Sequence, residues 1–118
     1  MEVLARDQQI HRLCADRSWR QRRLGPERAR KFRLRLDQLD AAETLEDLMS
    51  LPQARCHQLT RDLDECFSLD LDGPYRLILK VVEDPIPRRR DGGIDPKLVR
   101  RVQIFDIVDT HQEPQERK

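Results

Sequence analysis

Apolar residues in the first part of the chain recur at the spacing of a helix. A short strand is expected at residues 2–5, and Asp7 can cap a helix that runs to about Asp16. Ile10 and Leu13 fall on one face of that segment. The pattern therefore predicts an amphipathic first helix.

A second and longer helix is predicted after Gly25, because Pro26 suits the first turn of a helix. Arginines fill the face opposite its apolar positions, which are Ala29, Phe32, Leu36 and Leu39. Thr44 followed by Asp47 resembles a capping box, which predicts a short helical turn that Pro52 ends.

The period changes from helical to alternating after Pro52. The alternation predicts four strands, over residues 54–59, 65–71, 75–82 and 98–111. Asp72 and Gly73 are a signal for a hairpin turn, and residues 84–96 are expected to form an exposed loop. The last strand is apolar on both faces, as an interior strand of a sheet would be.

This order of elements predicts an α+β fold, in which two N-terminal helices pack on one face of a small, mainly antiparallel sheet. The other face would stay open and polar, and a functional site is expected there. A chain of 118 residues supports one modest core. We therefore expect a single domain over residues 1–111 and a flexible tail over residues 112–118.

The composition predicts a cytoplasmic protein. No apolar run approaches the roughly 18 residues that would span a bilayer, and the first residues lack the apolar stretch of a signal peptide. The three cysteines, Cys14, Cys56 and Cys66, are odd in number and lack CxxC spacing. Reduced thiols that pack in the fold are expected, rather than disulfides or zinc ligands.

Basic residues are concentrated in one segment, although the net charge is only +1. Residues 17–35 contain nine basic residues and one acid, Glu27. This segment is either a solvated helix face or a stripe that contacts phosphates, since clustered arginines provide the salt-dependent part of nucleic-acid binding. Aromatic residues make up only 4% of the chain, which argues against binding that depends mainly on base stacking.

Three stretches, in order along the chain, resemble the HigB-type plasmid maintenance killer proteins of the RelE/ParE toxin superfamily. They are RARKFRLRLDQLDAAETLEDL, LPQARCHQLTRDLDECFSLDLDGPYRLIL and VQIFDIVDTH. The first is similar to the basic second helix of that family and the second to its "LPG-RLHELKGDLKGYWSVRVNGNWRL" stretch. The third is similar to its closing strand, which commonly ends in Asp-Tyr-His. The resemblance spans roughly residues 27–111 and implies a RelE-like fold.

This resemblance implies the toxin of a type II toxin–antitoxin pair. Many members of the family cut messenger RNA in the ribosomal A site without a metal or cofactor. The RNA 2′-hydroxyl attacks its own phosphodiester, which requires a proton acceptor, a proton donor and fixed positive charge. The implied partners are a HigA-like helix-turn-helix antitoxin, the ribosome and mRNA, with operator DNA bound only through the antitoxin complex and no membrane.

The resemblance also assigns candidate catalytic residues. Arg76 matches an arginine of the family that can fork onto phosphate oxygens, although an ion pair across the sheet with Asp70 is the competing interpretation. His57, Asp109 and His111 match family residues suited to acid–base roles. Otherwise, His57 is an ordinary surface residue and His111 belongs to a frayed end.

The remaining candidates would contact RNA. Thr60 and Thr110 stand where the family has a lysine and a tyrosine, and Arg61 can substitute for the lysine. Without the lysine charge and the tyrosine ring, the protein would bind its RNA substrate less tightly and would stabilise the transition state less. Arg30 and Arg33, from the basic segment, are the further candidates for RNA contact.

Two other classes of protein function are compatible with the sequence. A ParE-like toxin, or a catalytically degenerate one, would act by binding alone, for example to DNA gyrase. A non-toxic interaction protein of the same operon is the other alternative. A DNA-binding antitoxin is disfavoured, because the helices are followed only by strands and show no helix-turn-helix pattern.

Overall fold

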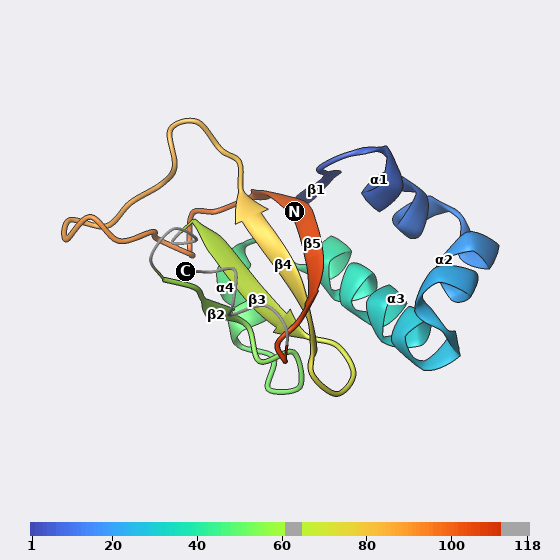
Figure 1. Ribbon diagram of the computed structural model, residues 1–118. Helices are drawn as coiled ribbons and strands as arrows, with labels where there is room; N and C mark the ends of the chain where they lie inside the picture. The colour runs from blue at the N-terminus through green and yellow to red at the C-terminus, as the bar shows by residue number, and fades with distance from the viewer. Residues whose placement is uncertain (61–64, 112–118) are drawn as a thin grey trace.

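The computed structural model describes residues 1–60 and 65–111, so the predicted tail over residues 112–118 lies outside the described part (Figure 1). The helices are α1 (Gln8–Ala15), α2 (Arg17–Leu24), α3 (Pro26–Ala41) and α4 (Leu45–Met49). The strands are β1 (Glu2–Ala5), β2 (His57–Gln58), β3 (Cys66–Asp70), β4 (Tyr75–Val81) and β5 (Arg101–Asp109). The predicted α+β class is confirmed.

The strands form one five-stranded sheet in the order β1-β5-β4-β3-β2. Neighbouring strands are antiparallel except β1 and β5, which run parallel. The sheet is therefore mainly antiparallel, as predicted. β5 lies between β1 and β4, so it is an interior strand of the sheet, as the sequence predicted. Figure 1 shows α3 behind the sheet and α1 and α2 beyond the edge that β1 forms.

The helical part of the chain contains a helix that the sequence pattern did not predict. Asp7 caps α1 as expected, and its Oδ1 accepts a hydrogen bond from the Ile10 backbone N–H at 2.9 Å. Asp16 follows α1 and also caps α2, since its Oδ1 accepts from the Trp19 N–H at 3.0 Å. Only Trp19 and Leu24 are apolar in α2, so no apolar stripe marked it. Within the described residues, no helix is long and apolar enough to cross a bilayer.

A cluster of buried side chains joins the helices to the sheet. Phe32 and Leu39 of α3 have no exposed area, and neither do Leu69 of β3 and Leu77 of β4. Burying a side chain of this size contributes roughly 1.5–3 kcal/mol. The apolar positions read from the sequence of α3 thus hold this helix against the sheet, and Arg30 and Arg33 remain on its outer side, whereas Arg35 is buried.

Two predicted segments need correction. Residues 54–59 do not form a full strand, since only His57–Gln58 pair with β3. Arg55 has a φ of 48°, which is outside the extended region, so the chain turns immediately before β2. The loop over residues 84–96 is largely exposed as predicted, but Ile94 within it is buried in the core.

The structure has the predicted hairpin turn, and its cysteines pack in the fold. Asp72 and Gly73 form the turn between β3 and β4, and Gly73 has a φ of 52° that glycine adopts without strain. Cys56 and Cys66 are buried and Cys14 is half-buried, as expected of cysteines that pack in the fold. Burial raises the pKa of Cys56 to about 12, so this thiol stays protonated and unreactive at neutral pH.

Candidate functional site

The sheet has one face packed on the core and one face that carries polar side chains. Leu69 of β3 pairs with Leu77 of β4, and both side chains point into the core. The neighbouring pair, Asp70 and Arg76, therefore lies on the opposite face. We call this the open face, although the prediction that the whole of it stays open is wrong, because Cys66, Ser68 and Ile78 on the same face are buried.

Arg76 is held on the open face by several acceptors. Its Nε lies 3.1 Å from Asp70 Oδ1, and its Nη1 donates to the carbonyl oxygens of Gly73 and Tyr75, both at 2.9 Å. The ion pair with Asp70, the competing interpretation of Arg76 from the sequence, is thus present. Nη2 has no hydrogen-bond partner among the described residues. The guanidinium is fixed in place and still has two N–H groups available for a ligand.

A second arginine shares the same carboxylate, and no motif in the sequence indicated it. Arg55 Nε lies 3.4 Å from Asp70 Oδ2, and the Arg55 side chain is 71% exposed. The alternation expected over residues 54–59 could have identified it, because Arg55 and His57 are two positions apart and would share a strand face. Asp70 therefore orients two cations, and its charge compensates only one of them.

The buried Arg35 of α3 stabilises this arrangement from the core side of the sheet. Its Nε donates to the Asp70 carbonyl oxygen at 2.7 Å, and its Nη2 donates to the Gln53 carbonyl oxygen at 2.9 Å. Burial lowers the pKa of Arg35, and the charge of Asp70 opposes this change. The Asp70 N–H in turn donates to the Ala54 carbonyl at 2.8 Å. These bonds fix the turn that carries Arg55 against the end of β3.

His57 lies in β2 on the open face, exposed to solvent and opposite Ser68. Its Nδ1 is 3.1 Å from the Arg55 carbonyl oxygen. A carbonyl only accepts hydrogen bonds, so Nδ1 carries a proton in this contact, and neutral His57 then presents Nε2 as a base. Strand spacing and register put the Cα atoms of His57 and Arg76 roughly 12 Å apart.

Asp109 and His111 lie at the end of β5, on the other side of Arg76 from His57. Asp109 pairs with Tyr75, the residue before Arg76 in β4, so strand alternation directs Asp109 to the face opposite Arg76. Its Oδ1 accepts from the His111 backbone N–H at 2.9 Å. The His111 side chain is exposed. Both residues thus lie at the same end of the sheet as Arg76, while His57 is nearest to the opposite edge.

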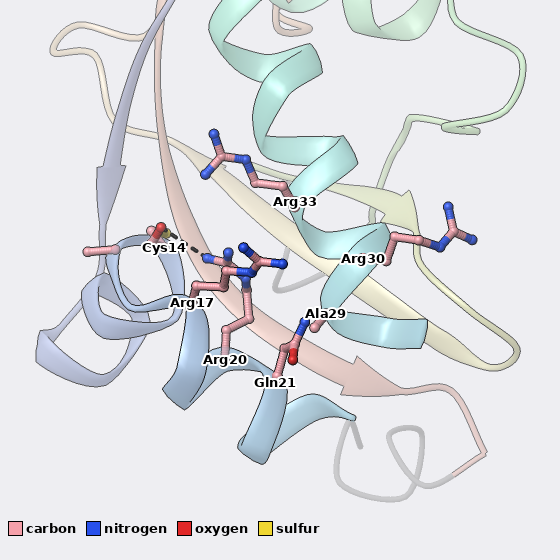
Figure 2. A pocket seen from close by; sticks show the side chains of 8 residues that line it. Cys14, Arg17, Arg20, Gln21, Ala29, Arg30 and Arg33 are labelled. Carbon is pink, nitrogen blue, oxygen red and sulfur yellow. Dashed lines mark hydrogen bonds between the residues drawn. The ribbon is translucent and has the colours of Figure 1, made fainter. Parts of the chain in front are cut away.

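The predicted RNA-contacting residues are divided between two places. Thr60 is exposed beyond β2, and the Thr110 N–H donates to the Pro74 carbonyl at 2.9 Å. Arg61 lies outside the described residues. Arg30 and Arg33 lie on α3, which packs on the other face of the sheet, and they line a cavity among the helices (Figure 2).

We call Arg55, His57, Asp70 and Arg76 the open-face cluster. It combines two cations, a carboxylate that orients them and an exposed imidazole, which suits it to a phosphate ester. Within residues 1–60 and 65–111, no group of three or more His, Cys, Asp or Glu side chains is placed to hold a metal ion. The sequence predicted only part of this cluster. Arg55 was not predicted, because it reaches Asp70 from a turn whose position depends on tertiary packing.

A protein-family model described as the RelE-like toxin of the type II toxin–antitoxin system HigB matches residues 5–89. The chain belongs to the HigB-like toxin family. No curated protein and no solved structure gives a match. The matched segment includes the whole open-face cluster and ends before β5, so the roles of Asp109 and His111 rest on the resemblance of the closing strand alone. As a type II toxin, the HigB-like protein has an antitoxin as its partner.

Proposed function

We propose that this HigB-like toxin is an endoribonuclease that cuts mRNA at the ribosome and so arrests translation in the cytoplasm. The observation that carries the proposal is the open-face cluster, in which Arg76 and Arg55 share Asp70 on the same face as His57. Fixed positive charge beside a group that exchanges protons near neutral pH is what RNA cleavage by internal attack requires.

The reaction needs no metal-bound nucleophile, because RNA carries its own. His57 Nε2 accepts the proton of the 2′-hydroxyl, whose oxygen then attacks the neighbouring phosphorus. The bond from phosphorus to the 5′ oxygen breaks, which leaves a 2′,3′-cyclic phosphate and a free 5′-hydroxyl. The leaving oxygen must gain a proton, and His111 beside Asp109 is the proposed donor, a role that rests on the resemblance to the family.

The two arginines stabilise the crowded phosphorane. Negative charge builds up on the equatorial oxygens as the 2′ oxygen attacks, and Arg76 Nη2 is available to donate to one of them. Arg55, with 71% of its side chain exposed, can reach a second oxygen. Asp70 and the carbonyls of Gly73 and Tyr75 hold the Arg76 guanidinium in place before substrate binds, so less reorganisation is needed during the reaction.

Arg55 can replace the lysine that the family has at the position of Thr60. Thr60 has no charge to offer a phosphate, whereas Arg55 puts a cation on the same face two residues before His57. We propose that Arg55 supplies the charge that the family lysine supplies elsewhere. Thr60 and Thr110 would then contact the RNA only through their hydroxyl groups.

The antitoxin is proposed to be a HigA-like helix-turn-helix protein encoded by an adjacent gene. It would bind the toxin tightly and bring the complex to operator DNA through its own helix-turn-helix. Co-expression of that gene is expected to restore growth. Persistent arrest in its presence would contradict this partner.

The deciding experiment adds the purified toxin to a bacterial translation extract and maps the ends of a translated message. Cuts that appear only when the message is being translated support the proposal. Arg76→Ala should remove them while the variant remains folded by circular dichroism. Intact messages combined with a DNA-damage response in cells would instead indicate a gyrase-binding toxin, and no effect on growth would indicate a non-toxic protein.

A further inference from the structure

Arg28, in the first turn of α3, contacts the hairpin turn between β3 and β4. Its Nε lies 2.9 Å from Asp72 Oδ1, and its Cζ lies 3.4 Å from the centre of the Tyr75 ring. Its Nη1 donates to the carbonyl oxygen of Leu24, the last residue of α2, at 3.4 Å. The guanidinium is therefore bound at once to a helix end, a carboxylate and an aromatic ring.

The burial of Arg28 distinguishes it from the arginines that follow it on α3. Only 23% of the Arg28 side chain is exposed, whereas Arg30 and Arg33 are 63% and 57% exposed in ion pairs within their own helix. Asp72, the partner of Arg28, is 24% exposed and lies 44 residues further along the chain. Water and salt screen a half-buried pair less than an exposed one. Arg28 thus holds the hairpin turn against the start of α3.

The turn that Arg28 holds also supplies acceptors for Arg76. Arg76 Nη1 donates to the carbonyl oxygens of Gly73 and Tyr75, both at 2.9 Å. Tyr75 takes part in both contacts, because its ring stacks on Arg28 while its carbonyl oxygen accepts from Arg76. Strand alternation directs the Tyr75 ring to the core side of the sheet and Arg76 to the open face. A movement of the turn therefore moves the oxygens that orient Arg76.

The same turn is bonded to the end of β5. The Thr110 N–H donates to the Pro74 carbonyl oxygen at 2.9 Å, and Asp109 is the register partner of Tyr75. The turn therefore contacts both parts of the proposed site, which are the guanidinium that binds phosphate and the strand end that carries the proposed proton donor.

We propose that Arg28 is a positioning residue for RNA cleavage, which fixes the turn over residues 72–75 and thereby the orientation of the Arg76 guanidinium. The inference rests on the proposed function and adds to it a residue that acts through Arg76 and does not touch the reacting atoms. Catalysis by fixed charge depends on donors that are in place before the substrate binds. A displacement of about 1 Å can cost about 10²-fold in rate.

A direct contact of Arg28 with RNA is the competing role, since Arg28 belongs to the basic segment over residues 17–35. The geometry favours positioning. Nε is bonded to Asp72, Nη1 is bonded to the Leu24 carbonyl oxygen, and the Tyr75 ring covers one face of the guanidinium. The two roles predict different kinetics, because loss of an RNA contact raises KM whereas loss of positioning lowers kcat.

The test compares Arg28→Gln with Arg12→Gln in the full-length toxin. Arg12 is the matched control, because it also pairs with a carboxylate, Asp16 at 3.4 Å, and lies over an aromatic ring, Trp19 at 4.7 Å. Both of its partners belong to the helical segment and not to the hairpin turn. Initial cleavage rates are measured over a series of concentrations of ribosomes that carry a message. Arg28→Gln should lower kcat about ten-fold and leave KM within about two-fold. Arg12→Gln should keep the parental values.

A conservative variant, Arg28→Lys, keeps a cation for Asp72 and loses the planar group that stacks on Tyr75. Its kcat should lie between those of the parent and Arg28→Gln. It also keeps the test decisive where the glutamine variant does not fold, which circular dichroism shows. Parental kcat in a folded Arg28→Lys and Arg28→Gln would overturn the inference.

A second measurement follows the Arg76 guanidinium without catalysis. Exchange of the Arg76 Nε–H with solvent, followed by nitrogen-15 NMR, should be faster in Arg28→Gln than in the parent and unchanged in Arg12→Gln, because Arg76 Nε is paired with Asp70 only while the guanidinium is held in place. An unchanged exchange rate in Arg28→Gln would overturn the inference.

A raised KM with parental kcat in Arg28→Gln would overturn the inference in favour of an RNA contact. Equal losses in Arg28→Gln and Arg12→Gln would overturn it as well, because loss of any such arginine would then slow cleavage. A parent that cuts no message contradicts the proposed reaction alone, and the exchange rate of the Arg76 Nε–H then decides whether Arg28 holds that guanidinium.

Discussion

Arg76 and Asp70 occupy opposed positions on β4 and β3, and 3.1 Å separate Arg76 Nε from Asp70 Oδ1. The other carboxylate oxygen of Asp70 lies 3.4 Å from Arg55 Nε. The pair could be read as purely structural, but the carboxylate cannot compensate both cations. The open face keeps a net positive charge, and its position is fixed by the register of two strands.

Replacement of Arg76 by alanine should reduce ribosome-dependent cleavage by about 10²–10³-fold, which is typical for the loss of one group that stabilises transition-state charge. The measurement is the initial rate of message cleavage in a translation extract. Arg88→Ala is the matched control, because Arg88 pairs with Glu65 at 3.7 Å on an exposed loop. An Arg76→Ala variant that is folded and cuts at the parental rate would place the site elsewhere.

Replacement of Arg35 by leucine should lower the free energy of unfolding by about 3 kcal/mol, because the carbonyls of Asp70 and Gln53 lose their donor inside the protein. Urea titration gives this quantity. Arg33→Leu on the same helix should cost about 1 kcal/mol or less, since Arg33 forms only an exposed pair. Equal losses in the two variants would mean that the buried bonds of Arg35 add nothing to stability.

The fold was largely predictable because its apolar pattern is local. The stripe of α3 and the alternation in β3 and β4 are visible in consecutive residues, and both appear in the structure. α2 was missed because most of its residues are polar, and the strand over residues 54–59 was shortened by a single residue, Arg55, with positive φ. Sequence spacing carries little information about such a conformation.

The candidate site was less predictable than the fold, for a related reason. Arg76 and His57 could be named from the resemblance, but the contact of Arg55 with Asp70 depends on how a turn packs on a strand 15 residues away in sequence. Arg35 supports that turn from inside the core, where the sequence pattern had indicated only an arginine on a basic helix. Contacts of this kind follow from tertiary packing rather than from spacing.

Stability should depend on the cap that joins α1 to α2. The hydrogen bond from the Trp19 N–H lowers the pKa of Asp16 from its ordinary value of 3.8, with a smaller contribution from Arg12, while burial opposes the change. A lowered pKa means that the carboxylate stabilises the fold fully above the unfolded pKa and loses this effect as pH falls through the folded one. Asp16→Asn can still cap but cannot titrate.

The measurement is the midpoint of urea unfolding between pH 7 and pH 2 for the parent and Asp16→Asn. The difference in unfolding midpoint between the parent and Asp16→Asn should be constant at neutral pH and should shrink as the pH falls below 3.8. A difference that stays constant over the whole range would show that the charge of Asp16 contributes nothing.

The last prediction concerns Thr60 and Thr110, which stand where related toxins have a lysine and a tyrosine. If Arg55 already supplies the missing charge, Thr60→Lys should raise cleavage only slightly in the parent and should restore much of the rate lost in Arg55→Ala. Thr110→Tyr adds a ring that can stack on a base, worth about 1–3 kcal/mol. If the ring stacks on the base in the transition state, this energy raises the cleavage rate by roughly one to two powers of ten.

His57→Ala serves as the control, because it should abolish cleavage in every one of these backgrounds if the imidazole takes the proton from the 2′-hydroxyl. Rates are compared in one translation extract at saturating toxin, so that differences report the chemical step. A large gain from Thr60→Lys in the parent, with no loss from Arg55→Ala, would assign the charge to the position of Thr60 and leave Arg55 as a structural partner of Asp70. No cleavage by the parent or by the folded Thr60→Lys, Thr110→Tyr double variant would rule out the ribonuclease, while the α+β fold and the family membership would stand, since neither depends on catalysis.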